Sequence, residues 1–363
     1  MKKIIILLAF ICSTISIQAQ EELEIPYSLL QLKQRAENGD SRAKFYLGYC
    51  YTEGLLGLPQ DVDKGVEFVK QACNEENPEA MHFVSKIIME NEDSPKAIST
   101  AEDLCKKAAE KGYVKAQKTL ADWYNCSNCK LPENQQAAFY WYLKAASAGD
   151  DDAMWHVGAH YDNEKNFQQA YKWYLKSAQK GNTVSMMNLG DMYRRGNGVI
   201  KDINTSIKWY KKVAETGENI TCLDLTEIYL KGEDGIDRDL VEAEKWYNRF
   251  CNSSNADAAI EIHNEILNEF AECYYEGKGT SVDYAKAFDY YKRAALNDNG
   301  YAQYSIGWMY EHGLGVTNNT NTALSWYRKA VRSGNKDART RINELKPSAH
   351  SNTSTKSRGG RRK

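Results

Sequence analysis

The sequence repeats itself about every 36 residues along most of its length. Aromatic pairs such as Trp173-Tyr174 and Trp326-Tyr327 recur at this spacing. Most of the eight units start 36 or 37 residues apart, while the fourth is short at 32 and the sixth long at 45. Such a period is typical of stacked units that bury a core only against their neighbours. The units start at Ala43, Ala80, Ala116, Ala153, Ser185, Thr221, Ile266 and Ala302.

Each unit is predicted to be a helix–turn–helix. Its first half carries apolar or small residues at offsets 0, 4 and 8, for example Ala302, Ile306 and Tyr310, which form one stripe of a helix. Offset 5 is always Gly, Ala, Ser or Thr, which would let the second helix approach closely. Paired glycines suited to a left-handed turn follow at Gly196/Gly198, Gly277/Gly279 and Gly313/Gly315. Capping residues for the second helix are predicted at Asp61, Asn134, Asp202, Asp239, Asp283 and Asn319.

The array has predicted ends as well as units. We expect a lone N-terminal capping helix within residues 21–42, eight repeats over 43–337, and a lone C-terminal capping helix over 338–346. Half-units of this kind shield the last apolar faces of a solenoid.

The two terminal segments lie outside this array. Residues 1–20 begin with two lysines, continue with a short apolar run and end in small residues, which is typical of a secretory signal peptide. The tail, residues 347–363, carries five basic residues and is expected to be disordered. The formal charge of −2 therefore conceals residues 21–346, which hold 40 basic and 49 acidic residues, a net charge of −9. An acidic array argues against nucleic acid as a partner.

The repeat resembles the Sel-like repeats (SLR), a subfamily of the tetratricopeptide-type repeats, over roughly residues 28–346. The family pattern is an alanine, then leucine-glycine, a tyrosine, a G-x-G-V turn and W-Y-x-K-A-A-x-x-G. The resemblance implies a right-handed α/α superhelical solenoid that scaffolds protein partners, and it implies no chemistry. Unit eight carries the pattern in Ala302, Ile306, Gly307, Tyr310, Gly313, Gly315, Val316, Trp326, Tyr327, Lys329, Ala330 and Gly334.

A partner-binding groove is predicted on the first helices. Offsets 3 and 6 lie away from the core stripe, and in the related tetratricopeptide repeats this face lines the concave groove. The alternative is an ordinary solvated helix face. Our hypothesis is a groove that receives a basic or extended peptide. The predicted groove residues are Asp122, Asp191, Asp224, Glu227, Glu269, Glu272, Ser305 and Trp308.

Two histidines stand at metal-ligand spacing. His156 and His160 are separated by four residues on the first helix of unit four, so both imidazoles could reach one metal. The glutamate of an H-E-x-x-H motif is missing, because Val157 takes its place. We therefore favour a structural role for both residues and expect no resident metal or other cofactor.

The remaining motif is a pair of cysteines, Cys126 and Cys129, at the end of a helix. A redox enzyme would place such a pair at the start of a helix, so a structural disulfide is favoured, either between these two or to Cys105. A second disulfide is predicted between Cys222 and Cys251, which the two antiparallel helices of unit six bring to one level.

Together these features predict an exported, periplasmic or secreted, non-enzymatic scaffold. It would be a monomer that binds a protein or peptide of basic character. The alternative is an enzyme built on the solenoid. That enzyme would be a metal-assisted hydrolase through His156 and His160, a thiol–disulfide enzyme through Cys126 and Cys129, or a β-lactamase-type enzyme. The last option follows from exported relatives, although the family pattern contains no catalytic triad. A third reading is a secreted factor that acts on another cell through the same surface.

Overall fold

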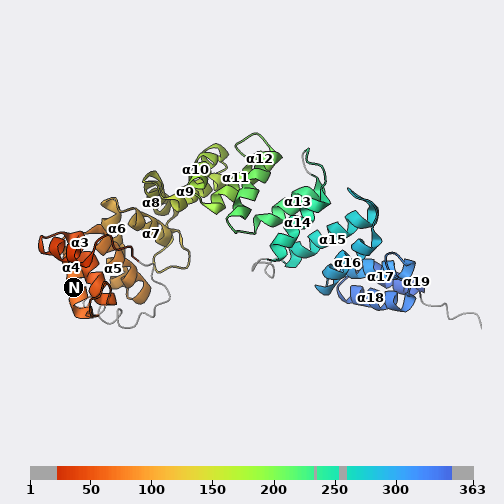
Figure 1. Ribbon diagram of the computed structural model, residues 1–363, viewed down its shortest axis with the longest axis horizontal. Coiled ribbons are helices and arrows are strands. Elements are labelled where there is room, and N and C mark those ends of the chain that lie inside the picture. The colour runs from red at the N-terminus through yellow and green to blue at the C-terminus, as the bar shows by residue number, and fades with distance from the viewer. Residues whose placement is uncertain (1–22, 233–234, 253–259, 346–363) are drawn as a thin grey trace, which may run out of the picture. The chain divides into compact units, whose positions relative to one another are not determined.

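The computed structural model describes residues 23–232, 235–252 and 260–345. The predicted signal peptide and the basic tail lie outside these residues. Within them the chain is all-α and contains no strand (Figure 1). The helices are α2 (Leu29–Glu37), α3 (Ser41–Glu53), α4 (Val62–Asn74), α5 (Pro78–Asn91), α6 (Pro95–Glu110), α7 (Val114–Asn125), α8 (Gln135–Ser147), α9 (Asp151–Asn163), α10 (Phe167–Gln179), α11 (Thr183–Arg195), α12 (Ile203–Glu215), α13 (Thr221–Lys231), α14 (Leu240–Cys251), α15 (Ile260–Glu276), α16 (Tyr284–Leu296), α17 (Gly300–His312), α18 (Thr320–Arg332) and α19 (Asp337–Leu345).

The helices form two compact units. The first unit runs to Met192 and includes Gly196–Ile200; the second comprises Tyr193–Arg195 and the chain from Lys201 onward. In the first unit the packed pairs are α3 with α4, α5 with α6, α7 with α8 and α9 with α10. In the second they are α13 with α14, α15 with α16 and α17 with α18. The predicted helix–turn–helix solenoid is therefore confirmed.

Helix ends follow the predicted capping chemistry. All six predicted capping residues are N-caps whose side-chain oxygens accept backbone N–H groups. These bonds satisfy donors that the first turn of a helix leaves without partners. All six paired turn glycines have positive φ, as predicted. The residues that begin and end the helices of each repeat therefore act by accepting backbone N–H groups or by allowing a left-handed backbone conformation.

The small residue at offset 5 allows each second helix to approach closely. A Cβ built on Gly307 would lie 2.7 Å from the ring of Tyr327, and one on Gly158 would lie 2.6 Å from the ring of Tyr174. Contacts this short do not occur between real side chains, so the tyrosines fill the space that glycine leaves. This confirms the predicted role of offset 5.

The aromatic pairs contribute to the core of the array. Their second members, including Tyr174 and Tyr327, are fully buried. The first members Trp173 and Trp326 are only partly buried, and each lies beneath the ammonium group of the lysine three residues later. The repeat spacing therefore places a tyrosine in the core, whereas the first member varies: Trp141, Trp246 and Tyr290 are buried as well, and Trp173 and Trp326 form cation–π contacts nearer the surface.

A single helix flanks the repeats at each end of the described chain. Helix α2 lies in the range assigned to the N-terminal cap and buries Leu32 and Ala36 in the first core. Helix α19 covers the C-terminal range and buries Ala338 against α18. In the part of the chain that the structure describes, no helix is long and apolar enough to span a membrane.

Candidate functional site

The predicted groove residues all lie on first helices of repeats. Asp122 is on α7 and Asp191 on α11. The other six are on α13, α15 and α17 of the second unit, where α13 contacts α15 and side-chain hydrogen bonds join α15 to α17. The structure thus groups these six on one face, which we name the α13–α17 face: Asp224, Glu227, Glu269, Glu272, Ser305 and Trp308.

Asp122 is held in a network within the first unit. Its carboxylate accepts a hydrogen bond of 2.7 Å from the buried Tyr142 hydroxyl and forms an ion pair of 3.0 Å with Lys118. Lys118 also pairs with Asp152 of the next repeat at 2.8 Å. Burial and the adjacent Asp122 charge raise the pKa of Tyr142, so its hydroxyl stays a proton donor. Asp122 thus joins the two helices of its own repeat and holds Lys118, which contacts the next repeat.

The two carboxylates of α13 are also paired. Arg194 lies 2.9 Å from Glu227 and 3.6 Å from Asp224, and Lys231 lies 2.5 Å from Glu227. Burial would raise the pKa of Glu227, but the hydrogen bonds and charges of Lys231 and Arg194 outweigh it and lower that pKa. This end of the face is therefore electrostatically balanced.

The carboxylates of α15 differ from those of α13. Within the described chain neither Glu269 nor Glu272 forms an ion pair. Burial raises the pKa of Glu269; the charges of Lys231 and Arg238 act against this rise, while those of Glu227 and Glu272 add to it. Helix α15 therefore carries two carboxylates, Glu269 and Glu272, that have no ion-pair partner among the described residues.

A cavity of about 240 Å³ opens beside this charge. Three predicted groove residues, Glu272, Ser305 and Trp308, line it. Sequence reasoning missed the five other lining residues, although on α15 and α17 they fall at helical spacings of three and four from the predicted ones. We name this cavity the α15–α17 pocket; its lining is Glu272, Tyr275, Glu276, Tyr291, Tyr301, Tyr304, Ser305 and Trp308.

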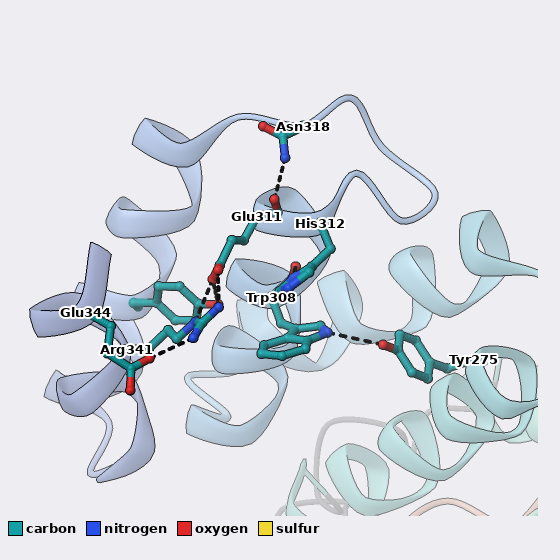
Figure 2. A network of polar contacts seen from close by, with 8 residues as sticks. Tyr275, Trp308, Glu311, His312, Asn318, Arg341 and Glu344 are labelled. Atoms are coloured by element: carbon teal, nitrogen blue, oxygen red, sulfur yellow. Dashed lines mark hydrogen bonds and ion pairs between the residues drawn. The ribbon is translucent and has the colours of Figure 1, made fainter. Parts of the chain in front are cut away.

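Hydrogen bonds between α15 and α17 fix the walls of the pocket. The Tyr301 hydroxyl donates to Glu272 over 3.0 Å. The Trp308 indole N–H donates to the Tyr275 hydroxyl over 3.2 Å (Figure 2). The Ser305 hydroxyl donates to the backbone carbonyl of Tyr301. The pocket is therefore a held arrangement of tyrosine and tryptophan rings with carboxylates at its side.

Trp308 connects the pocket to the last helix. His312 stacks on its ring at a centroid distance of 4.0 Å, and the Arg341 guanidinium lies 5.2 Å from the ring centroid. Figure 2 shows Arg341 directed at Glu311 and Glu344, with which it forms ion pairs. These two carboxylates balance the charge of Arg341.

The two predicted metal-ligand histidines stack on separate rings of α8. The His156 ring lies 4.0 Å from that of Tyr142, and the His160 ring lies 3.9 Å from that of Phe139. Burial lowers the pKa of His156. His160 also lies 3.4 Å from Glu164. No group of three or more metal-ligating side chains occurs among the described residues. These contacts favour the structural interpretation of both histidines.

One of the two predicted disulfides is present. Cys126 and Cys129 form a local disulfide at the C-terminal end of α7, while Cys105 is a buried free thiol. The negative end of a helix dipole disfavours a thiolate, so this position is unsuited to thiol catalysis.

The predicted Cys222–Cys251 disulfide is wrong, because both residues are free thiols. Cys251 packs against the core cluster built on α13 to α17, whereas the Cys222 sulfur lies 3.9 Å from the Asn219 side chain at the start of α13. Offset along the repeat gave the level of each cysteine but not the direction in which its side chain points.

Curated relatives match short parts of this chain. Chitin synthase regulatory factor 3 of Schizosaccharomyces pombe is 29% identical over 135 residues, which are 36% of this chain and 14% of that protein. Human Protein sel-1 homolog 2 is 33% identical over 100 residues, 25% of this chain and 13% of that protein. The ERAD-associated E3 ubiquitin-protein ligase component HRD3B of Arabidopsis thaliana is 34% identical over 62 residues, 17% and 10% of the two chains. This chain thus spans 14% or less of these relatives.

Solved structures match over more of the chain. A protective antigen with an SLR fold from uropathogenic Escherichia coli is 27% identical, with a TM-score of 0.66 over 88% of this chain and 67% of that one. A Sel1 repeat protein from Oxalobacter formigenes is 22% identical, with a TM-score of 0.53 over 92% of this chain and 99% of that one, and supports the fold alone.

The repeat pattern itself matches a family along most of the sequence. The Sel1 repeat matches eight times, at residues 41–77, 78–113, 114–150, 151–182, 183–217, 222–255, 269–299 and 300–335. Seven of these matches fall on the helix pairs described above, and the match at 183–217 spans α11 and α12. The chain therefore belongs to the Sel1 repeat family.

Proposed function

We propose that this protein is an exported, non-enzymatic scaffold that binds a basic protein or peptide through the α13–α17 face. One observation carries the proposal: Glu269 and Glu272 of α15 form no ion pair among the described residues, and Glu272 lines an open aromatic pocket. Carboxylates needed only for packing are paired, as Asp122 and Glu227 are. Charge left without a partner beside a pocket favours a ligand of opposite charge.

Two further features support a binding role. The names of the relatives describe a component of an E3 ubiquitin-protein ligase and a regulatory factor of chitin synthase, so each name refers to another protein or complex. The stacked histidines and the local disulfide supply no nucleophile, base and orienting group in one place among the described residues. Export rests on the composition of residues 1–20; N-terminal sequencing of the protein recovered from the envelope or medium would test it.

Affinity capture with charge-reversed protein tests the binding face. The full chain should capture a partner from envelope extract, and a variant with four lysines on the face should lose it. Glu269 and Glu272 alone should account for most of that loss, because the other two carboxylates are already paired. Undiminished capture would contradict the proposal. The four reversed residues are Asp224, Glu227, Glu269 and Glu272.

A matched variant controls for the change in net charge. It reverses four exposed carboxylates outside the face and should capture the partner as the unmodified chain does. Thermal unfolding of both variants shows whether the array remains folded. If the protein were instead an enzyme that uses His156, the single change His156→Ala would abolish its activity. The control residues are Glu37, Glu110, Glu215 and Glu218.

A further inference from the structure

We propose that the α15–α17 pocket binds the side chain of an arginine in an extended segment of the partner. This inference rests on the proposed function and names the group that anchors the partner. The argument uses the size, the charge and the aromatic lining of the pocket.

The size of the pocket suits one side chain. Its volume of about 240 Å³ is below the range of roughly 300–1,000 Å³ typical of sites for whole small-molecule ligands. Tyr301 on its wall is 46% exposed, so the pocket is reached from solvent. A long side chain that projects from a peptide backbone can enter where a larger ligand cannot.

The charge of the pocket selects a cation. Glu272 has only the Tyr301 hydroxyl as a hydrogen-bond donor within the described chain, so its carboxylate retains capacity for a second donor. Glu276 pairs with Lys278 at 2.5 Å, but both side chains are about half exposed, and such surface pairs exchange partners at little cost. A guanidinium that enters would gain a charge-assisted hydrogen bond to Glu272.

The lining favours arginine over lysine. Tyrosine and tryptophan rings attract cations, and a planar guanidinium can stack on a ring while it donates to a carboxylate. The protein already uses this combination beside the same ring: Arg341 lies over Trp308 and donates through Nε and Nη2 to the two oxygens of Glu311. Because Glu311 and Glu344 balance Arg341, its charge does not oppose a second cation nearby.

The Trp308 indole N–H provides a direct reporter. Its resonance, identified by its loss in Trp308→Phe, can be followed by NMR in the full chain while a capped Ala-Gly-Arg-Gly-Ala peptide is added. We expect a saturable shift with a Kd of about 1 mM, as for one anchoring side chain. The same peptide with citrulline, which keeps the shape of arginine without its charge, should cause no shift. A lysine peptide should bind several-fold more weakly.

Paired variants locate the site. Glu272→Gln should weaken the arginine peptide by about tenfold, which corresponds to one charge-assisted hydrogen bond. Glu265→Gln makes the same change on an exposed residue of the same helix outside the pocket and should have no effect. Equal shifts with arginine and citrulline, or equal affinity in Glu272→Gln, would overturn the inference.

The outcome separates this inference from the proposed function. If the charge-reversed face loses its partner but the arginine peptide gives no shift, the scaffold stands and the arginine anchor is wrong. If the peptide binds but no partner depends on the face, the pocket stands and the proposed function is wrong. If changing Arg358, Arg361 and Arg362 of the full chain to Gln shifted the Trp308 resonance and tightened the binding of the arginine peptide, the tail would be the occupant and the assignment to a partner would be overturned.

Discussion

Asp122 in the first unit and Glu272 in the second occupy the same position of their repeats, offset 6 of the first helix, yet they have opposite roles. Asp122 is enclosed by Tyr142 and by Lys118, which in turn reaches the next repeat. Glu272 receives one tyrosine hydroxyl and faces a pocket. The repeat therefore fixes where a carboxylate stands, while its neighbours decide whether it holds helices together or remains available to a ligand.

Replacing the tyrosines that donate to these two carboxylates should give the largest difference in unfolding free energy. Tyr142 is 4% exposed and Tyr301 is 46% exposed. Tyr142→Ala removes a buried aromatic side chain and should lower the unfolding free energy by about 3–5 kcal/mol. Tyr301→Ala should cost less than about 1 kcal/mol. Urea denaturation of both variants measures the contrast; similar losses would show that the pocket tyrosine is a core residue.

Replacing the carboxylates themselves should give a smaller difference in unfolding free energy, in the same direction. Asp122→Ala leaves the buried Tyr142 hydroxyl without its acceptor and should destabilise the protein by about 1–3 kcal/mol. Glu272→Ala releases a partly exposed tyrosine hydroxyl and should cost less than about 1 kcal/mol. Their thermal unfolding midpoints provide the measurement. A larger loss for Glu272 would mean that it, too, is structural.

Sequence alone predicts the array well, because period, caps and turn glycines are local. Asp61 and the five other capping residues act on N–H groups two or three residues away, and Gly307 acts within its own helix pair. The network of Asp122 and the α15–α17 pocket join residues of adjacent repeats. Such contacts depend on how two helices are rotated against each other, which offsets within one repeat do not specify.

The cysteines show the same limit. Cys126 and Cys129 are three residues apart, so the chain itself brings them together. Cys222 and Cys251 share a level across two helices, yet their side chains point to different neighbours. Spacing is a sound guide to a local disulfide and an insufficient one to a disulfide between helices.

Reduction should therefore affect the first unit and leave the second unchanged. The disulfide closes a very short loop, for which chain entropy predicts a contribution of about 2 kcal/mol at most. Adding dithiothreitol, or changing both Cys126 and Cys129 to Ser, should produce a modest fall in the unfolding midpoint of the same size. If dithiothreitol still lowered the midpoint of the double variant, another disulfide would be present.

The smallest expected effect is on the pH dependence of stability. A carboxylate on α13 and one on α15 should contribute to it with opposite signs. Because Lys231 and Arg194 hold the folded-state pKa of Glu227 below its ordinary value of 4.5, the Glu227 carboxylate stabilises the fold above that value. This stabilisation is lost as the pH falls through the lowered pKa. Burial, with the neighbouring carboxylates, raises the pKa of Glu269 against the opposing charges of Lys231 and Arg238, so its charge penalises the fold at neutral pH. That penalty is relieved as the pH falls through the raised pKa.

Glutamine variants at these two positions should thus have opposite effects on stability at pH 7. Because both side chains are partly exposed, we expect Glu227→Gln to lower the unfolding free energy by about 0.5 kcal/mol and Glu269→Gln to raise it by a similar or smaller amount. Both differences should shrink in urea titrations repeated below pH 4, where the carboxylates of the unmodified protein take up protons. Two changes of the same sign at pH 7 would show that Glu269 has a compensating partner. The penalty assigned to the charge of Glu269 would then have to be withdrawn, and with it part of the electrostatic basis for a basic ligand at the α13–α17 face.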